Sequence, residues 1–144
     1  MPAFHAHLAH TKLVYYVTRK KWWHVPPSDP NAYAFRGKFY ASSYREAEFY
    51  GRPENEPTRV NILNPLVGDE RTILTELFGD QERLGDMEAK DGLEFIVARH
   101  RLDSVMKKRA EELGYDAIIL MTPTGHAEYV CSGKIPRSLE LNML

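Results

Sequence analysis

Residues 113–130 read LGYDAIILMTPTGHAEYV, and this stretch carries the clearest structural signal in the chain. Its apolar run at 116–122 is nearly continuous, which predicts a strand buried on both faces. Pro123-Thr124-Gly125 has the composition of a turn, and residues 127–131 (AEYVC) predict a second strand directly after it. Strands this close cannot be joined by a helical crossover, so we expect them to pair antiparallel.

Further strands are predicted on both sides of this pair. Upstream, short runs rich in β-branched and aromatic residues predict strands at 12–18 (KLVYYVT), 38–42 (KFYAS) and 58–63 (TRVNIL). Downstream, residues 139–144 are expected to add an edge strand. Strands and helices are interspersed while the closing strands adjoin, so we predict an α+β fold rather than a doubly wound sheet.

Helices are predicted where capping signals meet apolar residues at helical spacing. Ser43-x-x-Glu46 is a capping box that begins a short helix ending near Gly51. A second helix is predicted over 69–78, with Asp69 as its cap and Gly79 as its stop. Residues 80–91 are charged and are expected to connect it to a third helix over 93–113.

The composition is that of an ordinary globular protein. Its 144 residues predict one domain over 1–144, with residues 1–11 expected as a flexible N-terminal tail. The formal net charge of −1 argues against a broad, non-specific grip on nucleic acid but allows a local basic patch. No apolar run reaches the roughly 18 residues of a membrane span. We therefore expect no membrane contact and a cytoplasmic location, in the producing cell or in a target cell.

Glu128 is the first candidate for chemistry. On the predicted strand it stands just after a glycine turn, and a carboxylate facing a cleft there could stabilise positive charge or act as a base. The same position also suits an exposed glutamate on a sheet with one solvated face. His126, two residues earlier, would share the strand face of Glu128.

Other patterns are weaker. Aromatic residues crowd the first fifty positions, where they either line a pocket for a planar ring or fill the core. His5, His7 and His10 form H-x-H-x-x-H, which suits a transition metal or a polar tail; we favour the tail and assign no metal site. The sequence contains no P-loop, G-x-G-x-x-G, G-x-S-x-G or H-E-x-x-H motif.

Several segments together resemble the ADP-ribosyltransferase family, in particular its phage and bacterial mono-ADP-ribosyltransferases. Residues 113–130, continuing to Ile135, are similar to the family's ending, in which a buried strand precedes a strand that carries a glutamate. Residues 37–51 (GKFYASSYREAEFYG) resemble its second motif, and residues 64–67 (NPLV) resemble a stretch common between the motifs. Tyr15-Tyr16-Val17-Thr18 stands where the family usually has YHGT or YRGT.

The resemblance implies an ADP-ribosyltransferase-like split β-sandwich of two small, mostly antiparallel sheets with flanking helices. It implies transfer of ADP-ribose from NAD to a macromolecular acceptor, expected to be a protein, with release of nicotinamide. A nucleic-acid acceptor stays open. By the same resemblance Glu128 is the catalytic residue, and the residues expected to bind the cofactor NAD are Tyr16, Thr18, Tyr40, Ser42 and Tyr50.

The departures from the family pattern define an alternative. Tyr16 replaces a His or Arg that orients the adenosine side of NAD, and a tyrosine hydroxyl carries no charge. His126 stands where arginine-modifying relatives have a second glutamate, so no acceptor residue is assigned. The alternative function is a catalytically inactive module of the same fold that binds a protein partner or a nucleotide.

Overall fold

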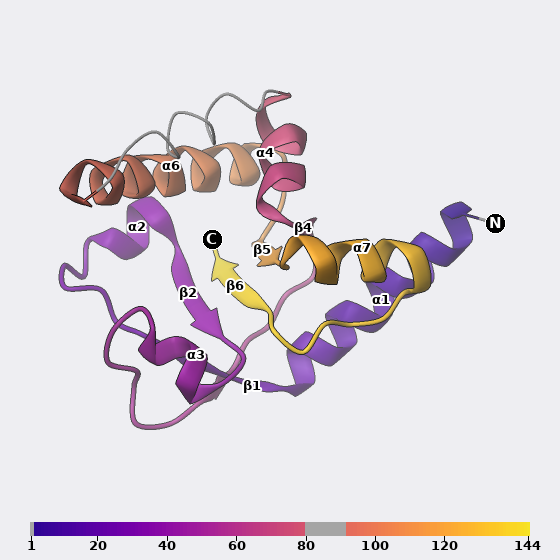
Figure 1. Ribbon diagram of the computed structural model, residues 1–144, viewed down its shortest axis with the longest axis horizontal. Helices are drawn as coiled ribbons and strands as arrows, with labels where there is room; N and C mark the ends of the chain where they lie inside the picture. Colours follow the sequence, from indigo (N-terminus) through magenta and orange to yellow (C-terminus); the bar gives the residue numbers. More distant parts are fainter. Residues whose placement is uncertain (1, 80–91) are drawn as a thin grey trace.

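The computed structural model describes the backbone of residues 2–79 and 92–144 and the side chains of residues 8–79, 92 and 94–144. Its strands form one open, mixed sheet in the order β3-β1-β2-β6-β5-β4. Figure 1 labels each of these strands except β3. The strands are β1 (Lys21–His24), β2 (Lys38–Ala41), β3 (Thr58–Arg59), β4 (Pro65–Gly68), β5 (Ala117–Leu120) and β6 (Glu140–Met143). The α+β class is confirmed, but the strands share a single sheet instead of forming two small ones.

β6 lies in the middle of this sheet. It pairs antiparallel with β2 on one side and with β5 on the other, so Leu141 stands opposite both Tyr40 and Ile119. The predicted strand over 139–144 is therefore confirmed, and its predicted position at the edge is wrong. Gly37 (φ +85°) makes the close pairing possible, because a Cβ at this residue would lie 2.8 Å from the Met143 carbonyl oxygen.

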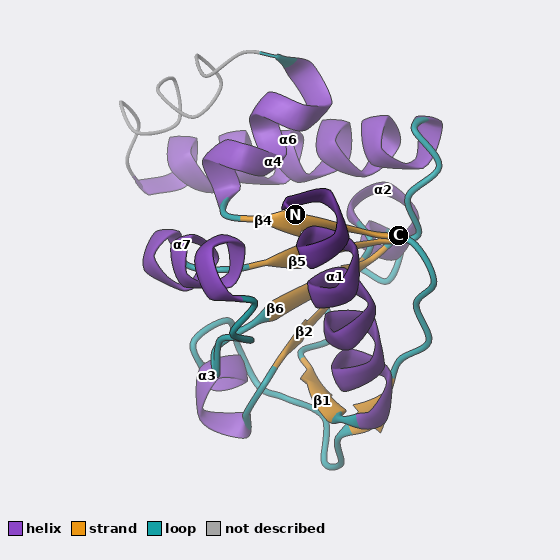
Figure 2. Ribbon diagram, turned by 90° about the vertical axis from the view of Figure 1, so that its right-hand side faces the viewer, coloured by secondary structure: helices purple, strands orange, loops and turns teal. Residues whose placement is uncertain are grey.

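Helices cover both faces of the sheet. α1 (Pro2–Arg19), which Figure 2 shows in front of the strands, shares a core with α7 (Pro123–Ser132). α4 (Glu70–Phe78) and α6 (Gly92–Glu112) share a second core on the other face. Successive side chains of β5 point to opposite faces of the sheet. Ala117 and Ile119 therefore belong to the first core, and Ile118 belongs to the second core. The shorter α2 (Ala32–Arg36) contacts α6, and α3 (Tyr44–Glu48) contacts β1 and β2.

α1 overturns the strand predicted at 12–18 and the tail expected at 1–11. Its buried residues Ala9, Leu13 and Val17 recur every four positions, which places them on one helical face against the sheet. The end of α1 is fixed by the Trp22 indole, whose Nε1–H donates to the Val17 carbonyl oxygen at 2.9 Å. Packing of this stripe overrides the β propensity of the KLVYYVT run, because intrinsic propensities are weak compared with burial.

α7 replaces both the turn at 123–125 and the strand at 127–131. Thr122 caps the helix by accepting a hydrogen bond from the Gly125 amide at 3.0 Å, and Pro123 occupies its first turn. Gly133, with φ +77°, ends the helix in the left-handed region. The expected antiparallel hairpin is therefore wrong, because β5 is followed by a helix.

The remaining helix signals are confirmed. Ser43 caps α3 by accepting from the Glu46 amide at 3.2 Å, and Asp69 caps α4 by accepting from the Thr72 amide at 2.9 Å. Gly79 ends α4 with φ +68°, as predicted. The helix predicted over 93–113 corresponds to α6, and the strand predicted at 58–63 shortens to β3. Residues 80–91, expected as a charged connection, lie outside the described residues.

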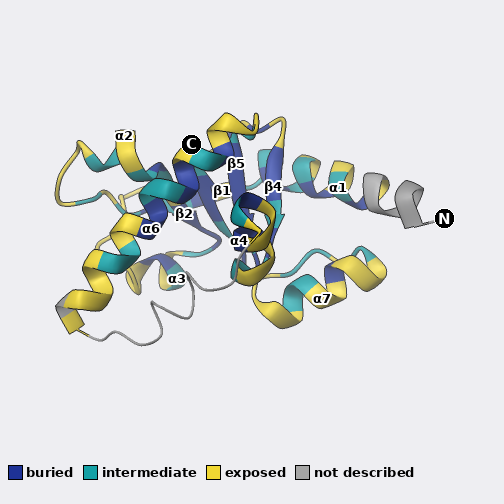
Figure 3. Cartoon of the chain, turned by 90° about the horizontal axis from the view of Figure 1, so that it is seen from above, coloured by how far each residue is buried: buried dark blue, intermediate teal, exposed yellow. Residues whose placement is uncertain are grey.

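Leu13 and Tyr15 distinguish the observed helix from the predicted strand. In a strand both side chains would share one face, whereas in α1 Leu13 is fully buried and Tyr15 is 60% exposed. Figure 3 shows buried, intermediate and exposed residues following one another along α1. We expect Leu13→Ala to lower the free energy of unfolding by about 2–5 kcal/mol, because it leaves a cavity. Tyr15→Ala should change it by less than about 0.5 kcal/mol. Urea unfolding of both variants provides the measurement, and equal losses would contradict the helix.

Candidate functional site

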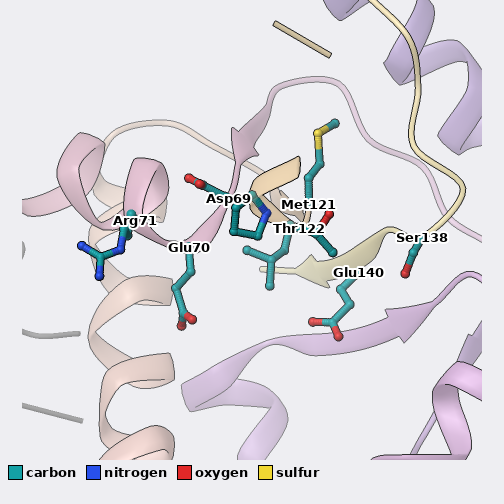
Figure 4. A pocket seen from close by; sticks show the side chains of 9 residues that line it. Asp69, Glu70, Arg71, Met121, Thr122, Ser138 and Glu140 are labelled. Atoms are coloured by element: carbon teal, nitrogen blue, oxygen red, sulfur yellow. The ribbon is translucent and has the colours of Figure 1, made fainter. Parts of the chain in front are cut away.

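A cavity of about 380 Å³ opens at the edge of the sheet where the parallel strands β4 and β5 end (Figure 4). Clefts at the carboxyl ends of parallel strands are frequent ligand sites, because helices begin there and backbone groups converge. Three segments line the cavity: the start of α4, the start of α7 and the approach to β6. Its lining residues are Asp69, Glu70, Arg71, Leu120, Met121, Thr122, Pro123, Ser138 and Glu140.

Glu140 is fixed in this cavity from the β6 side. As the first residue of β6 it stands opposite Ala41 of β2 and Leu120 of β5. Its carboxylate accepts a hydrogen bond from the Tyr50 hydroxyl. Partial burial and this carboxylate both raise the pKa of Tyr50, so the phenol keeps its proton and stays a donor. Glu140 is thereby held as an oriented, negatively charged group.

Asp69 and Glu70 supply two further carboxylates from the first turn of α4. Asp69 lies at the α4 N-terminus, with its Oδ1 3.9 Å from Nδ1 of His126. Partial burial acts to raise the pKa of Asp69, but hydrogen bonds from Thr72 and the nearby His126 hold it below its usual value. Asp69 is thus ionised over the physiological range and adds negative charge to the cavity.

Glu70 is anchored by a partly buried ion-pair network, in which Asp103 is the buried member. Arg99 of α6 pairs with the Glu70 carboxylate, and its Nε donates to Asp103 Oδ1 at 3.2 Å. Burial raises the pKa of Asp103 to about 6, against the opposing effect of Arg99. A second, smaller cavity is lined by Arg99 and Asp103 and shares Glu70, Leu120 and Glu140 with the first. Arg99 and Asp103 therefore connect helix α6 to the candidate site.

A hydroxyl cluster supports the β6 wall. The Ser138 hydroxyl donates to Glu46 Oε2 at 3.1 Å, and Ser42 Oγ lies at the same distance from that oxygen. Ser42 Oγ also accepts from the Leu139 amide at 3.0 Å. Since Ser42 is buried, its hydroxyl serves to join β2 to the segment before β6.

The structure gathers only some of the residues predicted for the site. Tyr50 contacts Glu140, and Ser42 lies beside Glu46 behind the wall. Thr18 is used within α1, where its hydroxyl donates to the Val14 carbonyl oxygen at 2.9 Å. Tyr16 packs from α1 against the first core, and Tyr40 is buried there with its ring 5.1 Å from that of His24.

Glu128 lies on a helix, so the prediction that it stands on a strand is wrong. Its side chain is 55% exposed on α7, with Oε2 3.8 Å from the Lys134 ammonium nitrogen. It is absent from the residues that line either described cavity. The two glutamates of the cavity, Glu70 and Glu140, were not found by sequence reasoning. One usable signal was that Asp69 and Glu70 follow directly after β4, at the end of a parallel strand.

Comparison with protein-family models, with curated proteins and with solved structures found no match to this chain. None of the helices formed by the described residues is long and apolar enough to cross a membrane. No group of three or more metal-ligating side chains occurs among the described residues. The side chains of His5 and His7 lie outside that part of the chain.

Asp103 makes the stability of the protein depend on pH. Its folded pKa of about 6 lies above the ordinary value of 3.8, so its stabilising contribution is complete below about pH 3.8 and is lost as the pH rises to about 6. Asp103→Asn removes this titration. Between about pH 4 and pH 7 the wild type should lose about 2–3 kcal/mol of unfolding free energy relative to the variant. Urea unfolding at several pH values tests this, and a constant difference would contradict it.

Proposed function

We propose that the protein is a mono-ADP-ribosyltransferase that moves ADP-ribose from NAD to a macromolecular acceptor, expected to be a protein, and releases nicotinamide. The cavity at the end of β4 and β5 would bind the nicotinamide-ribose part of NAD. The observation that carries the proposal is the oriented carboxylate of Glu140, held by Tyr50 on a cavity wall. An ADP-ribosyltransferase-like fold for the six-stranded sheet is part of the same proposal.

The reaction requires a carboxylate of this kind. The bond between ribose C1′ and the nicotinamide nitrogen breaks, and its electron pair leaves with nicotinamide. Positive charge develops on the ribose, and a fixed anion lowers the barrier by stabilising that charge. The acceptor then forms a bond to C1′ and gives its proton to solvent. A preoriented Glu140 is suited to this task because its geometry needs no reorganisation during the reaction.

The size and polarity of the cavity support the assignment. Its volume of about 380 Å³ lies at the lower end of the usual range for small-molecule sites, which suits one half of a dinucleotide. Asp69, Glu70 and Glu140 offer acceptors for ribose hydroxyls. α4 and α7 both begin at the cavity, so N-terminal amides and Arg71 stand beside its three carboxylates as donors to the oxygens of a diphosphate. In Figure 4 the α4 residues stand on the side away from Ser138.

A second candidate function is a nucleotide-binding module without turnover. It is favoured by the placement of Tyr16, Thr18 and Tyr40, because helix α1 and the core use these three predicted cofactor residues. Such a module would keep the cavity but lack the contacts that hold the nicotinamide ring against Glu140.

Nicotinamide release from NAD by the purified chain, with and without cell lysate, separates the two candidates. For the transferase we expect release that depends on lysate and falls at least about 100-fold in Glu140→Gln, because an electrostatic contact to the transition state is lost. Glu128→Gln is the matched control, since it makes the same substitution on exposed α7. It should keep wild-type activity.

Tyr50→Phe tests how Glu140 is held. Tyr50 is 60% exposed, so water screens its hydrogen bond to Glu140 and the bond contributes about 0.5–1 kcal/mol. We therefore expect nicotinamide release to fall roughly 2- to 5-fold while the protein stays folded. Loss of activity in Glu128→Gln with full activity in Glu140→Gln would instead return the catalytic role to Glu128. A folded protein that binds NAD by calorimetry but releases no nicotinamide would establish the binding module.

A further inference from the structure

A group of cations gathers where α1 ends and the edge strands pair. Arg19, Lys20 and Lys21 are consecutive, and Arg59 stands directly opposite Lys21 in the antiparallel pairing of β1 with β3. We call these four residues the basic cluster. The chain has no acidic residue before Asp29, so nothing in α1 offsets this charge. Figure 2 shows the end of α1 beside β1, at the edge of the sheet away from β4.

The pairing of Lys21 with Arg59 works against stability. Like charges directly opposite each other on paired strands repel, and both residues are exposed. None of the four cations forms an ion pair with an acidic side chain in the described part of the chain. The helix dipole of α1 accounts for basic residues at Arg19 and Lys20, but it does not account for Lys21 and Arg59. An anion from outside the chain would relieve this repulsion.

An exposed aromatic ring adjoins the basic cluster. Tyr15 is 60% exposed, and the Arg19 guanidinium carbon lies 4.9 Å from the centre of its ring. Lys12 shares the outer face of α1 with both residues, because positions 12, 15 and 19 recur at helical spacing. Cations for a phosphate backbone next to an aromatic ring for a base are the combination found in proteins that bind single-stranded nucleic acid.

We propose that the basic cluster and Tyr15 bind single-stranded nucleic acid, with the cations on phosphates and Tyr15 stacked on a base. The overall charge of −1 does not oppose this, because the four cations are adjacent in the chain or across paired strands and form a local positive patch. An anionic membrane is a poorer fit. Among the described side chains of α1, Leu13 and Val17 are buried against the sheet, and Leu8 and Tyr15 are the only large hydrophobic residues that are exposed. Two such side chains give too little apolar surface for insertion into a bilayer. The binding site is independent of NAD and of the proposed transferase activity.

Fluorescence anisotropy of labelled oligothymidylate and oligouridylate, titrated with the full chain at several salt concentrations, tests the proposal. With four phosphate contacts the logarithm of the association constant should fall against the logarithm of salt concentration with a slope of roughly −3. The double variant Lys21→Gln, Arg59→Gln should bind at least about 10-fold more weakly and reduce the slope by about 1.4. Its melting temperature should equal or exceed that of the wild type, because the substitutions remove a repulsion.

Matched control variants distinguish binding at the basic cluster from a general effect of protein charge, and they test whether the Tyr15 ring stacks on a base. Arg101→Gln with Lys108→Gln makes the same charge change on exposed positions of α6 and should leave binding unchanged. Tyr15→Phe should bind like the wild type, whereas Tyr15→Ala should lose at least about 5-fold. Equal losses in both double variants, or no binding by the wild type at low salt, would overturn the proposal. Binding to phosphatidylserine vesicles without binding to either oligonucleotide would overturn it in favour of a membrane surface.

Discussion

The whole sheet depends on the insertion of β6 between β2 and β5. No other strand pair among the described residues connects the antiparallel group β3-β1-β2 to the parallel pair β4-β5. Leu141 on this strand and Leu139 directly before it are almost fully buried. The hydrophobic effect and two ladders of hydrogen bonds therefore stabilise the same short segment. Without β6 the chain would hold two small sheets, each with an exposed edge.

The same strand places the candidate site. Glu140 begins β6 at the edge where β4 and β5 end, so the pairing that joins the sheet also brings a carboxylate to the cavity. On the opposite wall Glu70 is held by Arg99 of α6, a helix that contributes Leu102 and Met106 to the second core. Both carboxylates are thus positioned by groups that the fold already needs. The negative charge of this edge and the positive charge at the end of α1 are kept apart by the width of the sheet.

Features set by local chemistry could be predicted from the sequence. Asp69 and Gly79 bound α4 because a side-chain cap and a left-handed glycine act on their immediate neighbours. β2 and β5 were found for a similar reason, since their composition suits burial in a sheet. Tertiary packing decided the rest. Leu13 and Val17 lie in a run with β propensity, and only their burial with Ala9 makes it a helix. Glu70 and Glu140 meet because of the strand order, which no local pattern encodes.

The central place of β6 also has a consequence for how the protein is made. The other five strands formed by the described residues all precede β6 in the chain. β6 is therefore synthesised after both of the strand groups that it joins. Until residues 140–143 emerge, β2 and β5 each present an unpaired edge, and the cavity lacks the wall that carries Glu140. The nascent chain therefore stays without its candidate site during synthesis and is exposed to aggregation through those edges. The candidate site can form only after β6 has paired with β2 and β5.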